Sequence, residues 1–539
     1  MRTGSARWIA ASRWAMVFGL SIGLCACRKP GGAASGRGVP SLGKRIGEGP
    51  AADLRLTGDR KYATYLANPK KPRLEGIPPP MRIGALHTVA LGSDSPRKLG
   101  EGITNVPGGY LFSPDSHWVV YLAGYNAANQ SGELYAAELA NPASTPVRLG
   151  QAVSYSLVSP DSRSVAFVDS GILKLGALPQ GPFREVGGEV ATAQFSPDSR
   201  FLIYQRKLSA GAALMATRVD LGKSWRLAEQ VGDYQPGPDS RSVVFARHAE
   251  GSPDKYDLFL TGLALPTPGS KSAEVALPAK RLGSETGFFS FSPDGKWLGW
   301  IEGKKSEGAG QVMLAKSDGT AVRKIGDLAT DFSFAPDSTA VAYLDSYSDA
   351  ARAGVIAVTT LPEGKPRRIG NRVPNFSWGA DGRFLAFLSR FVKPVYSVDL
   401  MLYPLGEDKP FKVNTGVFGY GFSPHNRHLF LRTNCIRDGR ACDLYQLDLD
   451  KLKEPPKKIL EGIYTFKASD DEQRLLVTYA RVDVEAFDVA VYNLRTRERR
   501  TIDQRILLPP MFTTSDGTQA IYLVSDPSRA GLYVADRLP

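Results

Sequence analysis

Short apolar runs alternate with turn residues along nearly the whole chain, and one pattern of both recurs. The pattern is a bulky residue, then Ser-Pro-Asp-Ser or Ser-Pro-Asp-Gly, then a strand-like run with an aromatic residue, as in FSPDGKWLGW at 291. It occurs eleven times at intervals of 37 to 56 residues, mostly about 45, and such a period indicates a repeat fold. The anchor positions are Asp59, Asp115, Asp161, Asp198, Asp239, Asp294, Asp337, Asp381, His425, Asp471 and Asp516.

Each repeat contains four short apolar runs. The first ends at the Pro-Asp turn, the second follows it, the third alternates apolar and polar residues, as in DLFLTGL at 257, and the fourth opens with basic residues, as in RKIG at 323. No stretch after residue 27 shows sustained helical periodicity. Four short strands in a repeat of this length are typical of a propeller blade. The sequence therefore predicts an all-β β-propeller built from eleven four-stranded blade repeats.

The number of repeats bears on the domain organisation. Propellers usually have about 4–8 blades, so eleven repeats favour two propellers. We expect residues 42–283 to hold the first five motifs and residues 284–539 the last six, with a boundary near residue 283. One large ring is the alternative.

The two ends of the repeat region complement each other. Residues 44–47, Lys-Arg-Ile-Gly, match the fourth-strand pattern but precede the first motif, while the last repeat ends one strand short. Pairing them would remove an exposed strand edge. We therefore predict that residues 44–47 complete the final blade.

The recurring aspartates have a structural explanation. Pro presets φ for the first corner of a tight turn, Asp accepts a backbone N–H two residues on, and Gly or Ser tolerates the next position. A catalytic carboxylate would occur once rather than in every blade. We therefore predict turn-forming roles for Asp115, Asp161, Asp198, Asp239, Asp294, Asp337, Asp381 and Asp516.

The basic residues that open the fourth runs have two readings. The fourth strand is the outer edge of a blade, where Lys and Arg block edge-to-edge pairing with other chains. The alternative is a basic rim that docks an acidic partner or anionic lipid headgroups.

The first 26 residues are predicted to be an export signal. Three Arg and no acid precede an apolar run of 11 residues at 14–24, which is shorter than the roughly 20 residues of a bilayer span. The following Leu-Cys-Ala-Cys resembles a bacterial lipoprotein signal and predicts acylation of Cys27, with a plain signal peptide as the alternative. Residues 27–41 should form a flexible tether. Lys29 is not the Asp associated with inner-membrane retention, so we expect the outer membrane, facing the periplasm.

Two cysteines remain, Cys435 and Cys442, with strand-like runs on both sides. An exported protein meets an oxidising compartment. A disulfide that clips this hairpin is therefore expected rather than a metal site, because no His or second Cys pair is close in sequence.

Composition and motifs narrow the function further. The formal charge of +13 falls to +10 without the export signal, and it is spread too widely to indicate nucleic acid. No Gly-x-Ser-x-Gly nucleophile elbow, phosphate loop or dinucleotide fingerprint occurs. His425 and His428 alone are close together, and a surface turn explains them better than a metal. We expect no cofactor and no metal.

At the level of the repeats, the chain resembles the TolB-type β-propeller family, whose blade signature matches FSPDGKWLGW at 291. The resemblance covers residues 42–539. It implies a periplasmic protein that binds other proteins at the cell envelope. Similar blades precede the catalytic domain of prolyl-oligopeptidase-like peptidases, but this chain shows no such domain. It also has more repeats than the usual periplasmic protein.

Two functions follow as hypotheses. The first is a non-enzymatic scaffold, anchored to the membrane by lipid, that binds envelope proteins through its loops; a small-molecule ligand stays open. The second is a propeller enzyme, such as a polysaccharide lyase or a hydrolase, with its site at the channel mouth. Converging titratable groups there would favour an enzyme, and a mixed apolar and polar patch would favour binding.

Overall fold

The computed structural model describes residues 42–71, 81–209, 211–263, 278–303, 309–348, 351–392, 397–436, 439–481 and 486–539. Every regular element in these ranges is a β-strand, from β1 to β42, so the predicted all-β propeller fold is confirmed. Among these residues, no helix has the length and apolar character needed to cross a membrane.

Seven blades are separate four-stranded sheets in sequence order. They comprise β2 (Ala51–Leu56), β3 (Tyr62–Lys70), β4 (Ile83–Ala90) and β5 (Arg97–Thr104); β13 (Val190–Phe195), β14 (Phe201–Lys207), β15 (Ala212–Arg218) and β16 (Lys223–Ala228); β17 (Val231–Pro236), β18 (Ser242–Ala249), β19 (Ser252–Gly262) and β20 (Lys280–Gly283); β21 (Phe289–Phe291), β22 (Trp297–Glu302), β23 (Gly310–Lys316) and β24 (Arg323–Ala329); β25 (Phe332–Phe334), β26 (Ala340–Ser348), β27 (Ala353–Thr360) and β28 (Arg367–Val373); β29 (Phe376–Trp378), β30 (Phe384–Val392), β31 (Ser397–Pro404) and β32 (Phe411–Asn414); β33 (Val417–Phe422), β34 (His428–Ile436), β35 (Ala441–Asp448) and β36 (Lys457–Ile463).

The other four repeats are fused in pairs into two seven-stranded sheets. One contains β6 (Tyr110–Phe112), β7 (Trp118–Asn126), β8 (Ser131–Glu138), β9 (Val147–Val158), β10 (Ser164–Asp169), β11 (Ile172–Ala177) and β12 (Phe183–Gly188). The other contains β37 (Thr465–Ala468), β38 (Arg474–Ala480), β39 (Phe487–Asn493), β40 (Arg499–Phe512), β41 (Ala520–Val524), β42 (Gly531–Ala535) and β1 (Lys44–Glu48).

The prediction of eleven separate four-stranded blades is therefore corrected to seven such sheets and two fused ones. In each fused sheet, one long strand serves two repeats. The first half of β9 pairs with β8 and the second half with β10, and the change occurs at Val153. β40 pairs with β39 and β41 in the same way, with the change at Ile506. Because β9 and β40 each run without a break from one repeat into the next, the backbone hydrogen bonds join the strands of two repeats into one sheet.

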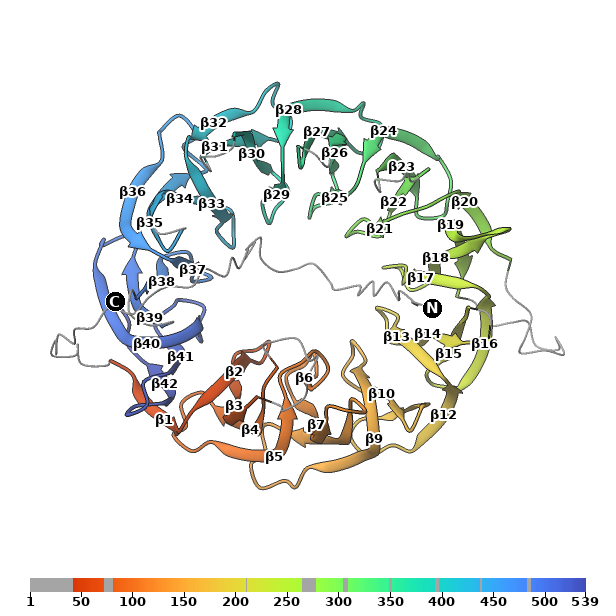
Figure 1. Ribbon diagram of the computed structural model, residues 1–539, viewed down its shortest axis with the longest axis horizontal. Coiled ribbons are helices and arrows are strands. Elements are labelled where there is room, and N and C mark those ends of the chain that lie inside the picture. Colours follow the sequence, from red (N-terminus) through yellow and green to blue (C-terminus); the bar gives the residue numbers. More distant parts are fainter. Residues whose placement is uncertain are drawn as a thin grey trace. The chain divides into compact units, whose positions relative to one another are not determined.

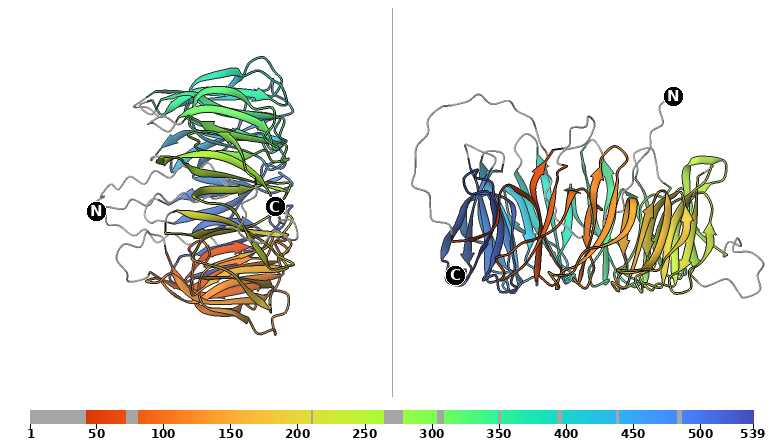
Figure 2. Two further views of the ribbon diagram at one scale, coloured as in Figure 1. Left: turned by 90° about the vertical axis from the view of Figure 1, so that its right-hand side faces the viewer. Right: turned by 90° about the horizontal axis from the view of Figure 1, so that it is seen from below.

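The expected division into two propellers near residue 283 is wrong. Residues Val39–Pro539 form one compact unit, and the sheets follow one another around a single ring (Figures 1 and 2). A buried apolar cluster crosses residue 283, because Leu258 of β19 packs with Phe289 and Leu298 of the next sheet. The same contact recurs between consecutive repeats, so nothing in the packing separates two groups of blades.

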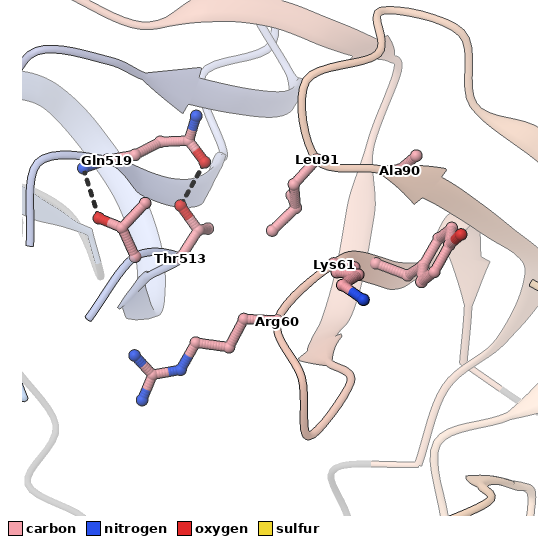
Figure 3. Close-up of a pocket in the computed structure, with 8 residues that line it drawn as sticks. Arg60, Lys61, Ala90, Leu91, Thr513 and Gln519 are labelled. Atoms are coloured by element: carbon pink, nitrogen blue, oxygen red, sulfur yellow. Dashed lines mark hydrogen bonds between the residues drawn. The ribbon is translucent and has the colours of Figure 1, made fainter. Parts of the chain in front are cut away.

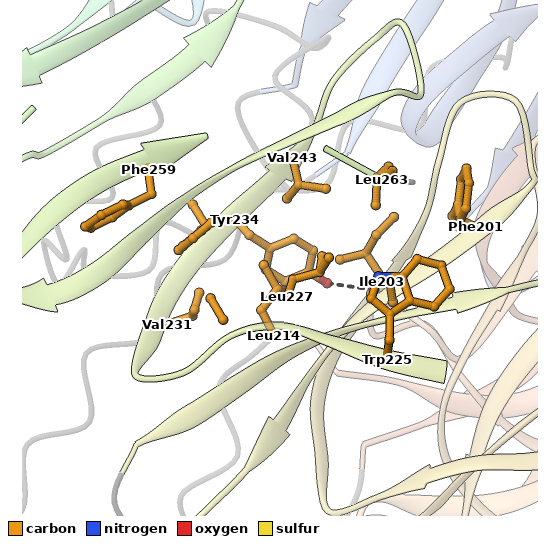
Figure 4. Packing of buried hydrophobic residues seen from close by; sticks show 13 residues of the cluster. Phe201, Ile203, Leu214, Trp225, Leu227, Val231, Tyr234, Val243, Phe259 and Leu263 are labelled. Atoms are coloured by element: carbon orange, nitrogen blue, oxygen red, sulfur yellow. Dashed lines mark hydrogen bonds between the residues drawn. The ribbon is translucent and has the colours of Figure 1, made fainter. Parts of the chain in front are cut away.

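Figure 4 shows one of these contacts, between the first and second separate sheets that follow the fused sheet β6–β12. Ile203 and Trp225 from β14 and β16 lie against Val243 and Phe259 from β18 and β19. The Tyr234 hydroxyl donates a hydrogen bond across the contact to the carbonyl of Ile203 at 3.1 Å. Each sheet buries apolar side chains on both faces, which is why the repeats can continue around a ring.

The predicted completion of the final repeat is confirmed. β1 pairs antiparallel with β42, with Lys44 opposite Val534 and Arg45 opposite Tyr533. Ile46 is buried in a cluster that also contains Ala63 of β3 and Leu532 of β42. The first strand of the chain therefore joins the last repeat to the first.

A glycine in the fourth strand allows consecutive repeats to approach. The third and fourth strands pair with a register shift at a recurring place; in β23 and β24, Val312 pairs with Gly326 and Met313 with Lys324. A Cβ on Gly326 would lie 2.6 Å from the ring of Tyr343 in the following repeat. Only Gly leaves space for that ring. The same arrangement joins Gly47 to Tyr65, Gly100 to Tyr121, Gly150 to Phe167, Gly187 to Tyr204, Gly283 to Trp300 and Gly370 to Phe387.

Candidate binding surfaces

The motif aspartates lie in the turns that the sequence predicts. Oδ1 of Asp115 accepts hydrogen bonds from the Ser113 hydroxyl at 2.5 Å and from the His117 N–H at 3.0 Å. Burial alone would raise the pKa of the Asp115 carboxyl, but these bonds bring it below its ordinary value. In seven other turns, the backbone N–H two residues after the aspartate donates to its carboxylate in the same way: those of Asp161, Asp198, Asp239, Asp294, Asp337, Asp381 and Asp516.

A second hydrogen bond joins each turn to the next. The residue after the aspartate has a positive φ, 64° at Ser162, a conformation that favours Gly. Ser162 is nevertheless suited to it, because its Oγ accepts the N–H of Asp115 in the preceding repeat at 3.0 Å. Sequence reasoning treated this serine as merely tolerated; its recurrence at a position that favours Gly is the signal of a further role. The same bond links Asp59 to Ser116, Asp161 to Ser199, Asp198 to Ser240 and Asp294 to Ser338.

Other residues take the place of this serine elsewhere. Asn426 Oδ1 accepts the N–H of Ala380 at 3.0 Å, and the Glu472 carboxylate accepts the N–H of His425. The first repeat has Arg60 at this position, which cannot accept such a bond. The side-chain acceptor is therefore missing where the first and last repeats meet, as it also is at Gly295, Gly382 and Gly517.

The basic residues of the fourth strands connect neighbouring repeats, which the sequence did not indicate. Arg323 donates hydrogen bonds to the carbonyls of Pro362 at 2.7 Å and Gly364 at 3.0 Å in the next repeat. The second basic residue of a fourth strand pairs with a carboxylate. In β28, Arg368 follows Arg367 and lies 2.9 Å from Asp345. Much of the positive charge on this edge is therefore engaged within the protein. The same carbonyl contact is made by Arg97, Lys280 and Arg367.

The predicted cysteine pair forms a disulfide between β34 and β35. Cys435 and Cys442 lie with their Cα atoms 4.1 Å apart. Beneath the hairpin, the buried Arg432 guanidinium donates to the Gly439 carbonyl at 2.8 Å and lies 5.3 Å from the ring of Phe418. Burial lowers the pKa of Arg432. The disulfide therefore holds a hairpin that buries the Arg432 guanidinium and lies against one edge of the partly exposed Phe418 ring.

The histidines serve separate local contacts. His428 donates its backbone N–H to the Ser423 hydroxyl at 2.9 Å, within the turn that also contains His425. His117 Nε2 lies 3.2 Å from a carboxylate oxygen of Glu138. In the part of the chain that the structure describes, no group of three His, Cys, Asp or Glu side chains could hold a metal ion.

The first strands of the repeats lie nearest the centre of the ring (Figure 1), and we call their exposed side chains the inner-strand surface. We include Phe288, which immediately precedes β21. Large apolar groups project from this surface: Tyr155, Phe288, Phe418 and Leu508 are 38%, 48%, 45% and 37% exposed. Exposed uncharged polar residues stand between them, among them Thr192, Gln194 and Ser333. The surface is therefore mixed, with apolar contact area and hydrogen-bonding groups side by side.

Ionisable groups on the inner-strand surface are dispersed. Arg55 and Asp53 of β2 form an ion pair at 2.8 Å. Asp233 lies on β17 and Lys467 on β37, which occupy opposite sides of the ring (Figure 1). Desolvation by the surrounding protein disfavours both charges, so it raises the pKa of the Asp233 carboxyl and lowers the pKa of the Lys467 ammonium. Within the described inner strands, these two shifted groups do not converge on one point.

A cavity of about 480 Å³ lies where the first and last repeats meet (Figure 3), and we call it the seam cavity. One wall comes from the turn before β3 and the end of β4, the other from the turn between β40 and β41. Cationic, hydroxyl, amide and apolar groups all contribute to it. Its lining residues are Arg60, Lys61, Tyr62, Ala90, Leu91, Thr513, Thr514 and Gln519.

Cys27, the export signal 1–26 and the tether 27–41 lie outside the described residues. Their roles stay predictions from the sequence.

No protein-family model and no curated protein matches the chain. Solved structures with a similar fold include a eukaryotic initiation factor (11% identity, TM-score 0.41, covering 72% of this chain and 96% of that one). The tricorn protease is another (11%, 0.30, 89% and 56%), as is an oligogalacturonate lyase from Vibrio parahaemolyticus (12%, 0.33, 63% and 94%). At these values the likeness carries no argument about this chain.

Proposed function

We propose that this protein is a non-enzymatic scaffold of the cell envelope that binds partner proteins on its inner-strand surface. The observation that supports this is the mixed character of that surface, where Phe288 and Phe418 are nearly half exposed beside polar side chains. Exposed aromatic groups on a rigid frame supply contact area at a small cost in conformational entropy, and this is typical of protein-binding surfaces.

The propeller holds these groups in place. The inner strands are tied to their neighbours by turn-to-turn hydrogen bonds, such as that from Asp161 N–H to Ser199 Oγ at 3.0 Å. A partner therefore meets a surface that needs little reordering on binding, which favours affinity.

The enzyme hypothesis needs titratable side chains from several repeats to converge on a substrate. Asp233 and Lys467, whose pKa values are shifted, stand on opposite sides of the ring. This dispersal favours binding over catalysis. A polysaccharide lyase or hydrolase remains the alternative that activity measurements must address.

The proposal includes the membrane anchor and the TolB-type resemblance. Acylation of Cys27 would attach the protein to the outer membrane on the periplasmic side, and two or more acyl chains give stable attachment. Cys27→Ala should release the protein into the soluble periplasmic fraction. A variant that still sediments with membranes would contradict the anchor.

Site-specific photo-cross-linking in cells tests the binding surface. A photoreactive amino acid at Phe288 or Phe418 should give adducts with envelope proteins. Leu221 is the matched control, because it is 49% exposed but lies in the loop between β15 and β16. Equal adducts at all three positions would contradict the proposal. So would turnover of an envelope polysaccharide by the purified protein that is lost on substitution of inner-strand residues.

A further inference from the structure

The junction between the first and last repeats departs from the pattern of the others in two ways. Arg60 replaces the usual serine, and its guanidinium reaches back to Asp470, with Nη1 2.7 Å from Oδ2. The turn of the last repeat is also one residue longer, since Thr513 N–H bonds the carbonyl of Gln519, six residues on. In the second repeat, the corresponding bond spans five residues. The seam cavity opens at this irregular junction.

The charges at the seam cavity are only partly compensated. Lys61 Nζ lies 3.6 Å from Asp59 Oδ2, and the Lys61 side chain is 75% exposed. An exposed pair at this distance is weak. Arg60 has Asp470 as its counter-charge, and both side chains are partly exposed. A second contact, from Arg60 Nη2 to Asp470 Oδ1 at 3.0 Å, makes that pair bidentate. Lys61 can therefore turn towards an anion that enters the cavity, while Arg60 stays beside Asp470.

The other lining groups add polar and apolar contacts. The hydroxyls of this wall are engaged within the turn: Thr514 Oγ1 accepts the N–H of Gln519 at 3.2 Å and lies 3.4 Å from the Thr518 hydroxyl, and a hydrogen bond from Thr514 lowers the pKa of Asp516. Ala90 and Leu91 form an apolar wall on the other side (Figure 3). The cavity has a volume of about 480 Å³ and is open to solvent, so a segment of another protein can reach its lining. The site therefore offers the Lys61 ammonium beside a hydrocarbon surface.

We propose that the seam cavity binds an acidic side chain, flanked by apolar residues, from an exposed segment of a partner protein. Lys61 receives the carboxylate, with the charge of Arg60 nearby, and the apolar neighbours lie against Leu91 and Ala90. A free inorganic anion would make no use of that wall, whereas a peptide uses both halves of the lining. The proposal rests on the scaffold function but uses a different surface from the inner strands.

Fluorescence anisotropy with a labelled peptide tests this. The probe is acetyl-Gly-Leu-Glu-Leu-Gly-amide, and its Gln counterpart lacks the charge. We expect the Glu peptide to bind the full-length protein more tightly, and its binding to weaken with added salt. Lys61→Gln should weaken it about fivefold or more, since charge-assisted bonds are stronger than neutral ones.

Two variants make the test specific. Lys296→Gln is the matched control, because Lys296 holds the same turn position, lies 3.2 Å from Asp294 and is 77% exposed, but is remote from the cavity in sequence and ring position. It should leave binding unchanged. Arg60→Ser installs the residue that this position has in five other repeats, so the fold should persist while binding falls.

Equal binding of the Glu and Gln peptides, equal effects of Lys61→Gln and Lys296→Gln, or complete competition by millimolar inorganic phosphate would overturn the proposal. Cross-linking at Phe288 and Phe418 reads out the inner-strand surface alone. Adducts there without peptide binding would refute the seam site while leaving the scaffold function in place.

Discussion

At the scale of single residues, the turn serine has two duties that conflict. Ser162 adopts a φ of 64°, which costs a non-glycine residue roughly 1 kcal/mol. Its hydroxyl also accepts the N–H of Asp115, and such a bond contributes about 1 kcal/mol. The two terms nearly cancel, which explains why Ser and Gly alternate at this position among the repeats.

Substitutions at Ser162 separate these terms. Ser162→Ala keeps the strained backbone and loses the bond, so we expect a loss of about 1 kcal/mol of stability. Ser162→Gly loses the bond but relieves the strain, so it should be nearly neutral. Thermal unfolding midpoints of the two variants measure this. If Ser162→Ala proves as stable as the wild type, the turn-to-turn bond contributes nothing, and if Ala proves as stable as Gly, the positive φ costs nothing.

His87 gives a residue-level prediction for pH. Burial, assisted by the charge of Lys98, lowers the pKa of His87 in the folded protein, while the unfolded value is about 6.5. The unfolded state then binds more protons below that pH. Stability from this group is present above about pH 6.5 and is lost as the pH falls from there towards the folded pKa.

The variant His87→Phe should reduce the acid sensitivity. Phe preserves a ring against Tyr65, whose centroid is 5.4 Å from that of His87. The difference in melting temperature between about pH 7.5 and pH 5.5 should be smaller than in the wild type. His428, whose pKa is also lowered by burial, should account for part of the remainder. An unchanged difference would show that His87 is not a proton-linked site.

At the scale of elements, the residue beside the register shift of the fourth strand varies together with the side chain of the next repeat that packs against it. Where the position after the shift is Gly, the next repeat supplies an aromatic ring. Where it is Leu460, paired with Leu444, the next repeat supplies the smaller Val477, and both lie in one buried cluster. The larger side chain thus lies on one side of the interface in most repeats, and the volume is divided more evenly between the two sides at Leu460 and Val477.

A double variant tests this exchange. Gly370→Leu places a side chain within 2.6 Å of the Phe387 ring and should cost about 2–3 kcal/mol. Phe387→Val leaves a cavity and should cost about 2–4 kcal/mol. Together they reproduce the Leu460 and Val477 pair, so the double variant should lose at least about 1 kcal/mol less than the sum. Strict additivity in thermal unfolding would contradict the exchange.

At the scale of the whole molecule, the ring depends on one short strand. β1 pairs with β42 and buries Ile46 between the last and first repeats. Without it, β42 would present an open edge, and such edges invite pairing with other chains.

Deletion of residues 42–48 should therefore destabilise the ring. Loss of the strand pairing and of the buried Ile46 should cost at least about 3 kcal/mol, and the free edge should promote association. Thermal unfolding and light scattering measure the two effects. A deletion of equal length within residues 30–36, outside the described part of the chain, is the control. Equal melting curves for both deletions would contradict closure by β1.

The sequence determined the local structure because its signals are local. Turn residues at fixed offsets, apolar runs of strand length and a period near 45 residues predicted the strands, the turn aspartates such as Asp115 and the pairing of residues 44–47 with the last repeat. These features depend on neighbouring residues and on the repetition of one unit.

Only the tertiary structure decided how the repeats join. The single ring, the fusion of repeats through β9 and β40, and the seam cavity between Lys61 and Thr514 all depend on angles and contacts between units. A repeat motif encodes each unit almost identically, whereas the number of units in a ring follows from small differences in packing at each interface. The roles of Ser162 and Gly326 were likewise hidden, because the partner of each lies in a different repeat.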